Sequence, residues 1–310
     1  MKCLITGGAG FIGSHLADTL IQNNELTIFD NLSSGKTAHI DHHLGKKSFR
    51  FIKGDLKDTR LLQDALKGQD LVLHLASNPD IARGIEETDL DLREGALLTF
   101  NVLEAMRMNG VRSIIYTSGS GIYGDQDAEP ISEDFGPLLP ISLYGASKLA
   151  SEGLISAFCN LFDMKAYIFR LANVVGARQT HGVIYDFIRK LKENPTSLEI
   201  LGNGTQSKSY IHVQDVIEAV LFVTDHCSDV INLYNVATDD YVDVTTIAKL
   251  VVSQMGCSNV EFRYTGGKRG WKGDVPTVRF DLGKIHQLGW KARYSSVQAI
   301  QKSIQEVLET

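Results

Sequence analysis

The sequence predicts an α/β fold in which a doubly wound parallel sheet is followed by a smaller C-terminal domain. Over the first half of the chain, short apolar runs alternate with segments whose apolar residues recur at helical spacing. A glycine-rich segment directly follows the first apolar run, and Gly, Pro and Asn become more frequent after Leu171. An alternating order of strands and helices favours a parallel sheet covered by helices on both faces.

Six apolar runs are expected to form buried strands, because parallel strands covered on both faces are apolar along their whole length. They are Lys2 to Thr6, Leu26 to Phe29, Phe49 to Lys53, Leu71 to Leu75, Ser113 to Thr117 and Ala166 to Leu171. Helical spacing connects Leu92, Ala96, Phe100, Leu103 and Met106, and also Ala150, Leu154 and Phe158. We therefore interpret residues 1–172 as the first domain.

A smaller domain is expected over residues 173–310. Segment 213–223 has the pattern of a helix and segment 231–236 that of a strand, so residues 210–237 are expected to return to the first domain. Val297, Ile300, Ile304 and Val307 predict a terminal helix with one packed face.

Composition and charge exclude several classes of protein. The 310 residues are 43% hydrophobic and 22% charged, which permits a large core and argues against disorder. A net charge of −6 argues against a protein that binds nucleic acid or an anionic membrane, since both need a basic face. No apolar stretch approaches the ~18 residues that span a bilayer, and the N-terminus lacks the pattern of a secretory signal.

The cysteine pattern points to a reducing compartment. Cys3, Cys159, Cys227 and Cys257 are widely spaced and form neither a CxxC pair nor a disulfide framework. We expect a cytoplasmic enzyme or binding protein.

The glycine-rich segment has the spacing of a dinucleotide-binding loop. Gly7, Gly10 and Gly13 form a GxxGxxG arrangement around Phe11 and Ile12, and a helical pattern follows. Glycines at these positions let backbone amides approach a pyrophosphate at a helix N-terminus, where the helix dipole favours negative charge. An ordinary glycine turn is the alternative, but the position between the first strand and the first helix argues against it.

Asp30 ends the second strand, 17 residues after Gly13. This is near the ~20-residue spacing at which an acid binds the adenosine ribose of a dinucleotide. A carboxylate there repels a 2′-phosphate, which favours NAD over NADP. The alternative is a turn residue preceding Asn31.

Tyr144 and Lys148 are the catalytic candidates. Their spacing of four residues places a phenol and an ammonium on one face of a helix, close to the strand ends where such sheets bind ligands. Tyr264 and Lys268 have the same spacing without that context. Ionising a phenol at pH 7 needs a shift of ~3 units, or about 4 kcal/mol, whereas an exposed ion pair supplies only ~0 to 1 kcal/mol. We therefore expect Lys148 to act in a desolvated pocket, together with the positive ring of bound oxidised NAD.

Together the motifs resemble the extended short-chain dehydrogenase/reductase family, and most closely the UDP-glucose 4-epimerase-like NAD-dependent nucleotide-sugar epimerases. The resemblance covers nearly the whole chain and implies a Rossmann-type first domain that binds NAD and a second domain that binds substrate. The motifs that carry it are residues 7–13, 30–32, 54–56, 74–76, 122–124, 144–148, 170–176, 204–206 and 273–276.

The resemblance also implies roles for individual residues. Tyr144 would be the catalytic base and Lys148 would hold the nicotinamide ribose. The cofactor-binding residues would also include Asn31, Asp55, Leu56, Leu75, Ala76 and Ser77, with Asp55 meeting the adenine. The substrate-binding residues would be Asn173, Lys208, Arg269, Asp274 and Val278. Ordinary roles as a turn residue, a cap or solvated charges remain open for Asp55, Asn173, Lys208 and Arg269.

The sequence departs from the family pattern in three respects, one of which involves two positions. Gly119 stands where a Ser or Thr usually bonds the substrate oxygen, so either Ser118 or Ser120 is expected to supply that hydroxyl. Trp271 stands where an Arg is common, with Arg269 two residues earlier, and Lys208 also stands where Arg is usual. Gly95 replaces an Asn that would be a polar anchor near the site.

No metal site is expected. His39, His42 and His43 lie close together, but apart from Asp41 no nearby acid completes a set of ligands, so a solvated loop is the preferred interpretation.

The leading functional hypothesis is UDP-glucose 4-epimerisation through a 4-keto intermediate, with a UDP-sugar as the substrate and a homodimer formed through helices around Asn101 and Leu154. A nucleotide-sugar 4,6-dehydratase is the alternative enzyme, but it needs an acid and a base where this chain has Ser120 and Gly121. A non-catalytic NAD-binding sensor is the alternative from another class. In the resembling epimerases the residue at position 278 borders the sugar 2-substituent. The valine there leaves space, so the resemblance implies that N-acetylated sugars are also accepted.

Overall fold

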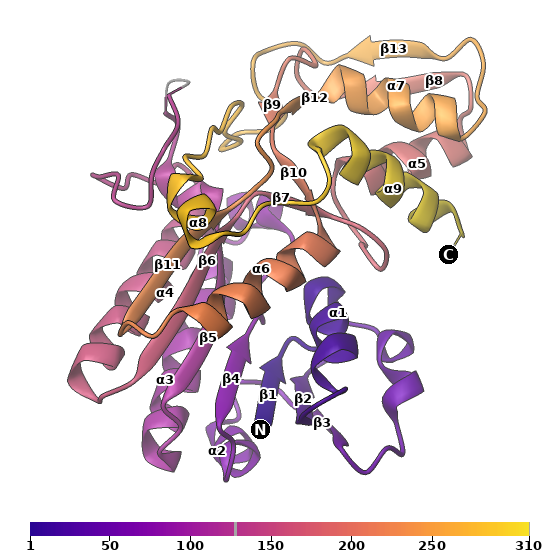
Figure 1. Cartoon of the computed structure of the whole chain (residues 1–310). Helices are drawn as coiled ribbons and strands as arrows, with labels where there is room; N and C mark the ends of the chain where they lie inside the picture. The colour runs from indigo at the N-terminus through magenta and orange to yellow at the C-terminus, as the bar shows by residue number, and fades with distance from the viewer. Residues whose placement is uncertain (127–128, 310) are drawn as a thin grey trace. The chain divides into compact units, whose positions relative to one another are not determined.

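The central sheet is built from the apolar runs of the first half of the chain. The computed structural model describes residues 1–126 and 129–309. Within these ranges, seven strands form one sheet in the order β11-β6-β5-β4-β1-β2-β3 (Figure 1). Their bounds are β1 Lys2–Thr6, β2 Glu25–Asp30, β3 Phe49–Lys53, β4 Leu71–His74, β5 Ser113–Gly119, β6 Lys165–Leu171 and β11 Ile231–Val236. The predicted α/β class with a doubly wound parallel sheet is confirmed.

The register places the carboxyl ends of neighbouring strands side by side. Strand β1 pairs in parallel with β2 on one side and with β4 on the other, and Thr6 lies opposite both Phe29 and His74. Strand β5 continues the sheet, with Tyr116 opposite His74. The residues that follow β1, β2, β4 and β5 therefore meet along one edge, where parallel α/β sheets bind ligands.

Helices connect these strands and flank the sheet. They are α1 Phe11–Leu20, α2 Thr59–Leu66, α3 Leu97–Asn109 and α4 Leu143–Leu161. Helix α6 Val213–His226 precedes β11 in the sequence. Asp58 starts α2 by accepting a hydrogen bond from the Leu61 amide, and Gly110 ends α3 in the left-handed conformation that favours glycine. Buried aliphatic residues, among them Leu103 on α3 and Ile155 on α4, join helices and sheet into one core.

Packing divides the chain into two units. The first comprises residues 1–119, 143–170 and 223–234, and the second comprises 120–142, 171–222 and 235–310. These units do not coincide with the expected domains, 1–172 and 173–310. Segment 120–142 packs within the second unit, and only residues 223–234 of the expected returning segment pack within the first.

The second unit combines short strand pairs with helices. Strand β7 Asn173–Val175 pairs with β10 Tyr210–His212, β8 Ser197–Ile200 with β13 Glu261–Tyr264, and β9 Ser207–Lys208 with β12 Val242–Asp243. The helices are α5 Val183–Glu193, α7 Val244–Gln254, α8 Gly283–Leu288 and α9 Ser296–Glu309. The predicted terminal helix thus exists, and Ile300 and Ile304 on its packed face are fully buried.

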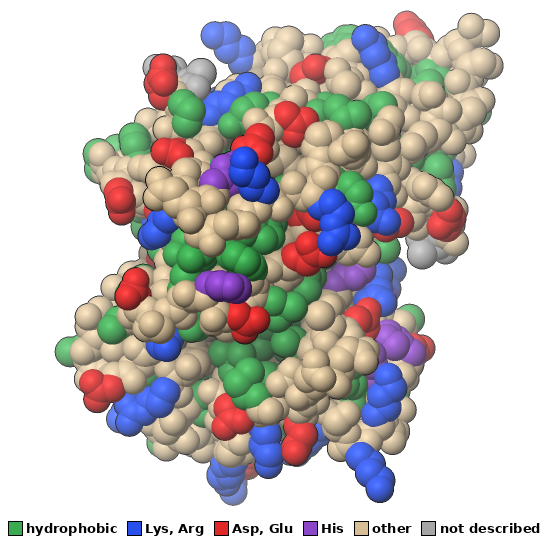
Figure 2. Space-filling model, in the orientation of Figure 1, with side chains coloured by type: hydrophobic (Ala, Val, Ile, Leu, Met, Phe, Trp, Pro, Cys, Tyr) green, Lys and Arg blue, Asp and Glu red, His purple; other side chains and the backbone are tan. Residues whose placement is uncertain are grey.

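The surface carries mixed charges. Figure 2 shows Lys and Arg side chains interspersed with Asp and Glu side chains on the face in view. The net charge of the chain is −6. No helix in the described part of the chain has the length and apolar character needed to cross a bilayer.

Candidate cofactor and catalytic site

The glycine loop turns sharply between β1 and α1. Gly7 has a φ of +68°, and a Cβ atom there would lie 2.9 Å from the Ala76 amide nitrogen. A Cβ atom on Gly13 would lie 2.3 Å from the Gly7 carbonyl oxygen. Glycine is therefore required at both positions, by the conformation at Gly7 and by the close approach at Gly13.

Helix α1 begins at Phe11 in a form suited to an anion. Its N-cap residue, Gly10, makes no side-chain capping bond, and the first turn, which includes Ile12, contains no acidic residue. The first amides of a helix have no partner within the helix, and the helix dipole makes this end positive. Backbone amides and dipole together can hold a pyrophosphate.

Asp30 is fixed at the end of β2, beside the glycine loop. Its Oδ2 accepts a hydrogen bond from the Ala9 amide at 2.9 Å, and its Oδ1 accepts one from the Leu32 amide at 2.8 Å. The residue is only 7% exposed. Its carboxylate is thus held in a defined orientation at the sheet edge, where a ribose hydroxyl could donate to it.

Asp55 lies close to the end of β2 through a contact with Asn31. Asn31 Nδ2 donates to Asp55 Oδ2 at 3.1 Å, and the Lys57 amide donates to Oδ1 at 2.9 Å. Partial burial alone would raise the pKa of Asp55, but these two hydrogen bonds and the Lys57 charge lower it. Asn101 on α3 holds the next residue by donating to the Leu56 carbonyl oxygen at 3.1 Å.

The segment after β4 completes the edge beside the glycine loop. The Leu75 amide donates to the Thr6 carbonyl oxygen at 3.2 Å, which continues the β1–β4 ladder. Ala76 then lies against Gly7, as the close approach of its amide shows. Ser77, the next residue, hydrogen-bonds the Tyr144 side chain.

Tyr144 and Lys148 lie one turn apart on α4. Lys148 Nζ is 5.5 Å from the centre of the Tyr144 ring and 4.9 Å from that of Tyr116. The same ammonium donates to the Thr117 carbonyl oxygen at 2.9 Å, and Lys148 is 5% exposed. Strand β5 therefore fixes the lysine, and the expectation of a desolvated ammonium matches its burial.

Burial sets the protonation of both groups. It raises the pKa of Tyr144 to about 12, with the Asp91 charge adding to the effect and the Ser77 hydrogen bond opposing it. Burial also lowers the pKa of Lys148 to about 8, against the opposing charges of Glu152 and Asp91. The phenol is therefore protonated at neutral pH until a further positive charge enters the site.

Asp91 is a nearby carboxylate that the sequence pattern did not reveal. It is 2% exposed, and its Oδ1 accepts a hydrogen bond from Asn78 Nδ2 at 2.9 Å. Its Oδ2 is buried without a hydrogen-bond partner among the described residues. Because Asp91 follows no motif and precedes a π-helix, Leu92–Ala96, only the folded chain brings its charge to the Tyr144–Lys148 pair.

Ser147 connects α4 to this π-helix. Its hydroxyl donates to the Asp91 carbonyl oxygen at 2.6 Å and accepts from the Ala96 amide at 3.0 Å. The loss of the expected Asn at Gly95 is thus balanced by a hydroxyl from α4, which takes the space left by the glycine.

A buried polar network lies behind the pair. His74 Nδ1 hydrogen-bonds Thr6 Oγ1 at 2.7 Å, and His74 Nε2 hydrogen-bonds Thr99 Oγ1 at 3.1 Å. Thr99 Oγ1 also contacts Ser151 Oγ on α4 at 3.0 Å. These bonds tie the ends of β1 and β4 to α3 and α4, so they fix the helix that carries Tyr144.

The two serines beside Gly119 differ in their surroundings. Ser118 lies one residue before the end of β5 in the first unit and is 5% exposed. Its Oγ has no hydrogen-bond partner among residues 1–126 and 129–309. Ser120 begins a 3-10 helix, Ser120–Tyr123, in the second unit and is half-buried. A buried hydroxyl without a partner is costly, which marks Ser118 as a group able to bond a ligand.

The predicted substrate residues lie in the second unit, where several of them meet. Lys208 Nζ pairs with Asp274 Oδ1 at 2.6 Å. Arg269 donates to the Asp274 carbonyl oxygen at 3.1 Å and pairs with Asp125. Asp274 is 7% exposed and its Oδ2 accepts from the Gly270 amide at 3.0 Å. Lys208 thus pairs with the buried Asp274 carboxylate, and Arg269 is held by the carbonyl oxygen of the same residue.

The other two predicted substrate residues lie in different surroundings. Asn173, half-buried, hydrogen-bonds the Tyr210 side chain, which is buried. Val278 is 5% exposed. Both lie in the second unit, as Lys208 and Asp274 do.

Tyr264 and Lys268 do not share the geometry of the other pair. Tyr264 ends β13, is 43% exposed, and its hydroxyl contacts Thr245 Oγ1 at 3.1 Å. Strand β13 ends at Tyr264 and Lys268 follows it outside any helix, so no helical turn places the two side chains on one face.

These features fit a nicotinamide dinucleotide. The tight glycine loop and uncapped α1 suit a pyrophosphate, the fixed Asp30 carboxylate suits a ribose, and the buried Lys148 ammonium suits a second ribose hydroxyl. The half-buried Tyr144 completes a site that can remove a proton beside such a cofactor.

Comparison with known proteins points to the same chemistry. The family model described as the NAD dependent epimerase/dehydratase family matches residues 3–237. The UDP-glucose 4-epimerase of Mycolicibacterium smegmatis is 29% identical over 315 residues, which cover 98% of this chain and 98% of that protein.

Solved structures are similar over the full length. A crystal structure of a UDP-galactose 4-epimerase has a TM-score of 0.89 and 37% identity, covering 100% of this chain and 99% of that chain. A UDP-N-acetylglucosamine 4-epimerase from Methanobrevibacter ruminantium, in complex with UDP-N-acetylmuramic acid, has a TM-score of 0.88 and 26% identity. That match covers 99% of this chain and 98% of the other.

Proposed function

Because this chain belongs to the NAD dependent epimerase/dehydratase family and is an NAD-dependent enzyme, we propose that it is a nucleotide-sugar 4-epimerase that interconverts UDP-glucose and UDP-galactose. The observation that carries the proposal is the buried Lys148 ammonium 5.5 Å from the Tyr144 ring, beside the cofactor loop. The segment at Ser120 and Gly121 contains no carboxyl group. The pair supplies a base, and the segment lacks the acid and base that elimination would need.

Tyr144 takes the proton from the sugar 4-hydroxyl and later returns it to the 4-oxygen. The glycine loop, Asp30 and Lys148 would hold NAD, which would supply reversible removal of a hydride from C4 of the sugar. Lys148 stabilises the phenolate of Tyr144, because its ammonium lies 5.5 Å from the ring, is only 5% exposed and is therefore weakly screened. One proton reaches the phenolate oxygen and one leaves it in each turnover, so Tyr144 ends the cycle as it began.

A serine hydroxyl is proposed to hydrogen-bond the sugar 4-oxygen, the role of the Ser or Thr that usually stands at the position of Gly119. Ser118 is favoured because its buried Oγ has no partner among the described residues. Ser120 is the alternative.

The second unit is proposed to bind the UDP portion of the substrate. Lys208 and Arg269 would meet the diphosphate, Asp274 would orient them and approach the ribose, and Asn173 would contact the sugar nucleotide. Lys208 pairs with the Asp274 carboxylate and Arg269 donates to the Asp274 carbonyl oxygen. These contacts support the role because they hold both cations in place before a phosphate arrives.

The sugar 2-substituent is proposed to lie near Val278. A valine leaves space, so UDP-N-acetylglucosamine should be accepted beside UDP-glucose. The similarity to a UDP-N-acetylglucosamine 4-epimerase supports this proposal. Competition between the two substrates checks it, and a preference of ~100-fold or more for UDP-glucose, about 2.7 kcal/mol, would contradict it.

Asp30 is proposed to make the enzyme prefer NAD to NADP. Its fixed carboxylate is only 7% exposed and would repel a 2′-phosphate in a poorly screened setting. Titration calorimetry with both cofactors checks this preference, and equal or tighter binding of NADP would contradict it.

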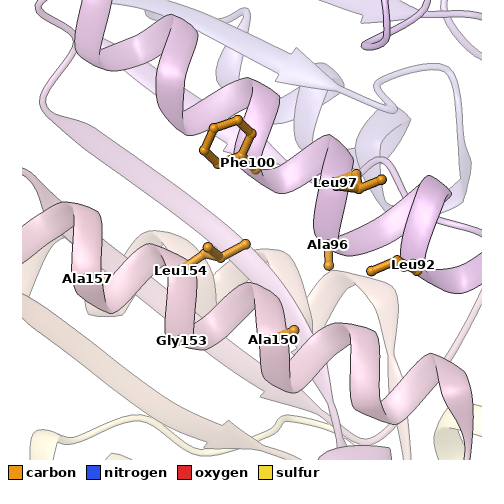
Figure 3. A pocket seen from close by; sticks show the side chains of 8 residues that line it. All are labelled: Leu92, Ala96, Leu97, Phe100, Ala150, Gly153, Leu154 and Ala157. Atoms are coloured by element: carbon orange, nitrogen blue, oxygen red, sulfur yellow. The ribbon is translucent and has the colours of Figure 1, made fainter.

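A homodimer is proposed through α3 and α4. An apolar groove in the first unit is lined by Leu92, Ala96, Leu97, Phe100, Ala150, Gly153, Leu154 and Ala157 (Figure 3). Leu97 and Phe100 are 48% and 42% exposed, whereas α4 offers small residues, so a second copy can place its large side chains over the small ones. Sedimentation of the wild type and Leu97→Glu checks the proposal: the wild type should be a dimer and Leu97→Glu a monomer. A monomeric wild type would contradict the proposal.

A cytoplasmic location is proposed from the thiols. All four cysteines are free, and Cys3 and Cys159 are buried. Fractionation of cells checks the proposal, and recovery of the native protein outside the cytoplasm would contradict it.

The direct test of function is a panel of UDP-sugars incubated with the NAD-loaded protein and analysed by chromatography. We expect UDP-glucose and UDP-galactose to interconvert, and Tyr144→Phe, the matched control, to leave both unchanged. A 4-keto-6-deoxy product would indicate a dehydratase. Retained NAD with no conversion of any sugar would indicate a sensor.

A further inference from the structure

We propose that Asp18, His42 and His43 form a binding site for one divalent transition metal ion, with Zn²⁺ as the ion that the ligands suit best. The sequence interpretation of this histidine cluster as a solvated loop without a metal considered only Asp41 as a completing acid. The fold supplies a different acid, because α1 brings Asp18 to the histidines from 24 residues away.

The three side chains converge on one point. His42 Nε2 lies 2.8 Å and His43 Nε2 lies 2.6 Å from the same oxygen, Asp18 Oδ1. The three ligand atoms all lie within 4.8 Å of one another. Zn²⁺ binds His nitrogen and carboxylate oxygen at ~2.0 to 2.2 Å in a tetrahedron. The three ligand atoms therefore need to move only slightly apart to make room for the ion.

The neighbouring groups of the same loop are not part of the set. His39 Nδ1 contacts the Ala9 carbonyl oxygen at 2.9 Å, and Asp41 Oδ1 is 3.9 Å from the other ring nitrogen of His42. At that distance the Asp41 carboxylate makes no hydrogen bond to His42.

The site is fixed on one side and open on the other. The His43 side chain is 4% exposed and its ring lies 5.4 Å from that of Phe49 on β3, so its position is set by packing. The Asp18 and His42 side chains are 31% and 45% exposed. An ion can enter from this exposed side and keep a water molecule as its fourth ligand.

Lys46 holds His43 in the tautomer that disfavours metal. Its ammonium lies 2.9 Å from His43 Nδ1, and because an ammonium only donates, Nδ1 accepts and Nε2 carries the proton that points at Asp18. Metal at Nε2 requires that proton to move to Nδ1 through solvent, with no net change in the charge of the ring. Lys46, which is exposed, must then turn away.

The Lys46 ammonium beside His43 would also repel a cation bound to that ring. Removing the Lys46 charge should strengthen metal binding, and removing a ligand should weaken it.

The experiment uses the full-length untagged protein, stripped with chelator and titrated with Zn²⁺ by calorimetry, with Co²⁺ absorption as a probe of ligand geometry. We expect one equivalent to bind the wild type at micromolar concentration. His42→Ala should weaken binding by ~100-fold or more, and Asp18→Asn should do the same. Lys46→Met should tighten binding by ~10-fold, whereas Lys47→Met, the matched control on the next exposed residue, should match the wild type.

Thermal unfolding separates loss of the site from loss of the fold. His42 is exposed, so His42→Ala without metal should unfold at the wild-type temperature. Zn²⁺ should raise the melting temperature of the wild type but not that of His42→Ala. The proposal is overturned if the wild type binds no Zn²⁺ at micromolar concentration, or if one equivalent still binds both His42→Ala and Asp18→Asn with wild-type affinity.

Discussion

The hydroxyl of Ser147 lies where a side chain on Gly95 would have to be. A Cβ atom built on Gly95 would come within 2.1 Å of Ser147 Oγ. That hydroxyl cannot retreat without loss, because it bonds both the Asp91 carbonyl oxygen and the Ala96 amide. The glycine in the π-helix and the serine one position before Lys148 are therefore a matched pair, and together they fix the start of α4.

Gly95→Ala is expected to lower both stability and turnover. The methyl group would displace Ser147 and break its hydrogen bonds, and overpacking of this kind costs ~1 to 3 kcal/mol. Thermal unfolding and steady-state kinetics measure the two effects. Adding Ser147→Gly should recover part of the stability by removing the clash, with Ser147→Gly alone as the reference. A Gly95→Ala variant as stable and active as the wild type would show that the two residues are not coupled.

Tyr144→Phe is expected to abolish epimerisation and leave the fold and NAD content intact, because it removes one hydroxyl from a ligand site. Tyr264→Phe, its matched control, should be nearly silent since that phenol lies on an exposed strand. Product formation from UDP-glucose and the absorbance of retained cofactor are the measurements. Comparable losses in the two variants would refute the assignment of the base.

Ser118→Ala is expected to lower turnover by ~10²-fold or more without lowering stability. The Ser118 hydroxyl makes no hydrogen bond to the described residues, so its removal breaks none there, but a bond to the reacting oxygen would be lost. Kinetics and urea unfolding of Ser118→Ala, Ser120→Ala and the double variant show whether Ser118, Ser120 or neither supplies the hydroxyl. Full activity in all three variants would exclude a serine relay.

The free energy of unfolding is expected to fall below pH 6.5 because of His74. Burial, reinforced by the Lys148 charge, lowers the pKa of His74 from 6.5 to about 3. Between these values the unfolded chain binds a proton that the folded chain excludes, so acidification favours unfolding by up to about 1.4 kcal/mol per pH unit. Urea unfolding from pH 7 to pH 5 should show a shallower dependence for His74→Gln than for the wild type. Identical slopes would contradict a neutral buried His74.

The fold could be predicted from local patterns because each strand and helix is encoded over a few neighbouring residues. The predicted strands at 2–6, 49–53 and 231–236 coincide with β1, β3 and β11. The π-helix at Leu92–Ala96 could not be predicted, since its apolar spacing resembles that of an ordinary helix.

The candidate site divides in the same way. The glycine loop and the Tyr144–Lys148 pair are local motifs, and the structure gives both a geometry that suits their expected roles. Asp91, and the meeting of Asp18 with His42, depend on contacts between segments far apart in the chain. Because these residues are far apart in the sequence, they form no motif of fixed spacing from which the contacts could be predicted.

An isotope label that follows the hydride tests the central claim, that the enzyme is a 4-epimerase, most directly. UDP-glucose labelled with deuterium at C4 is incubated with the NAD-loaded enzyme, and the product is analysed by NMR. A 4-epimerase that returns the hydride to the carbon from which it came should yield UDP-galactose with deuterium retained at C4. Deuterium at C6 of a 4-keto-6-deoxy sugar, or no UDP-galactose from enzyme that holds NAD, would contradict the assignment.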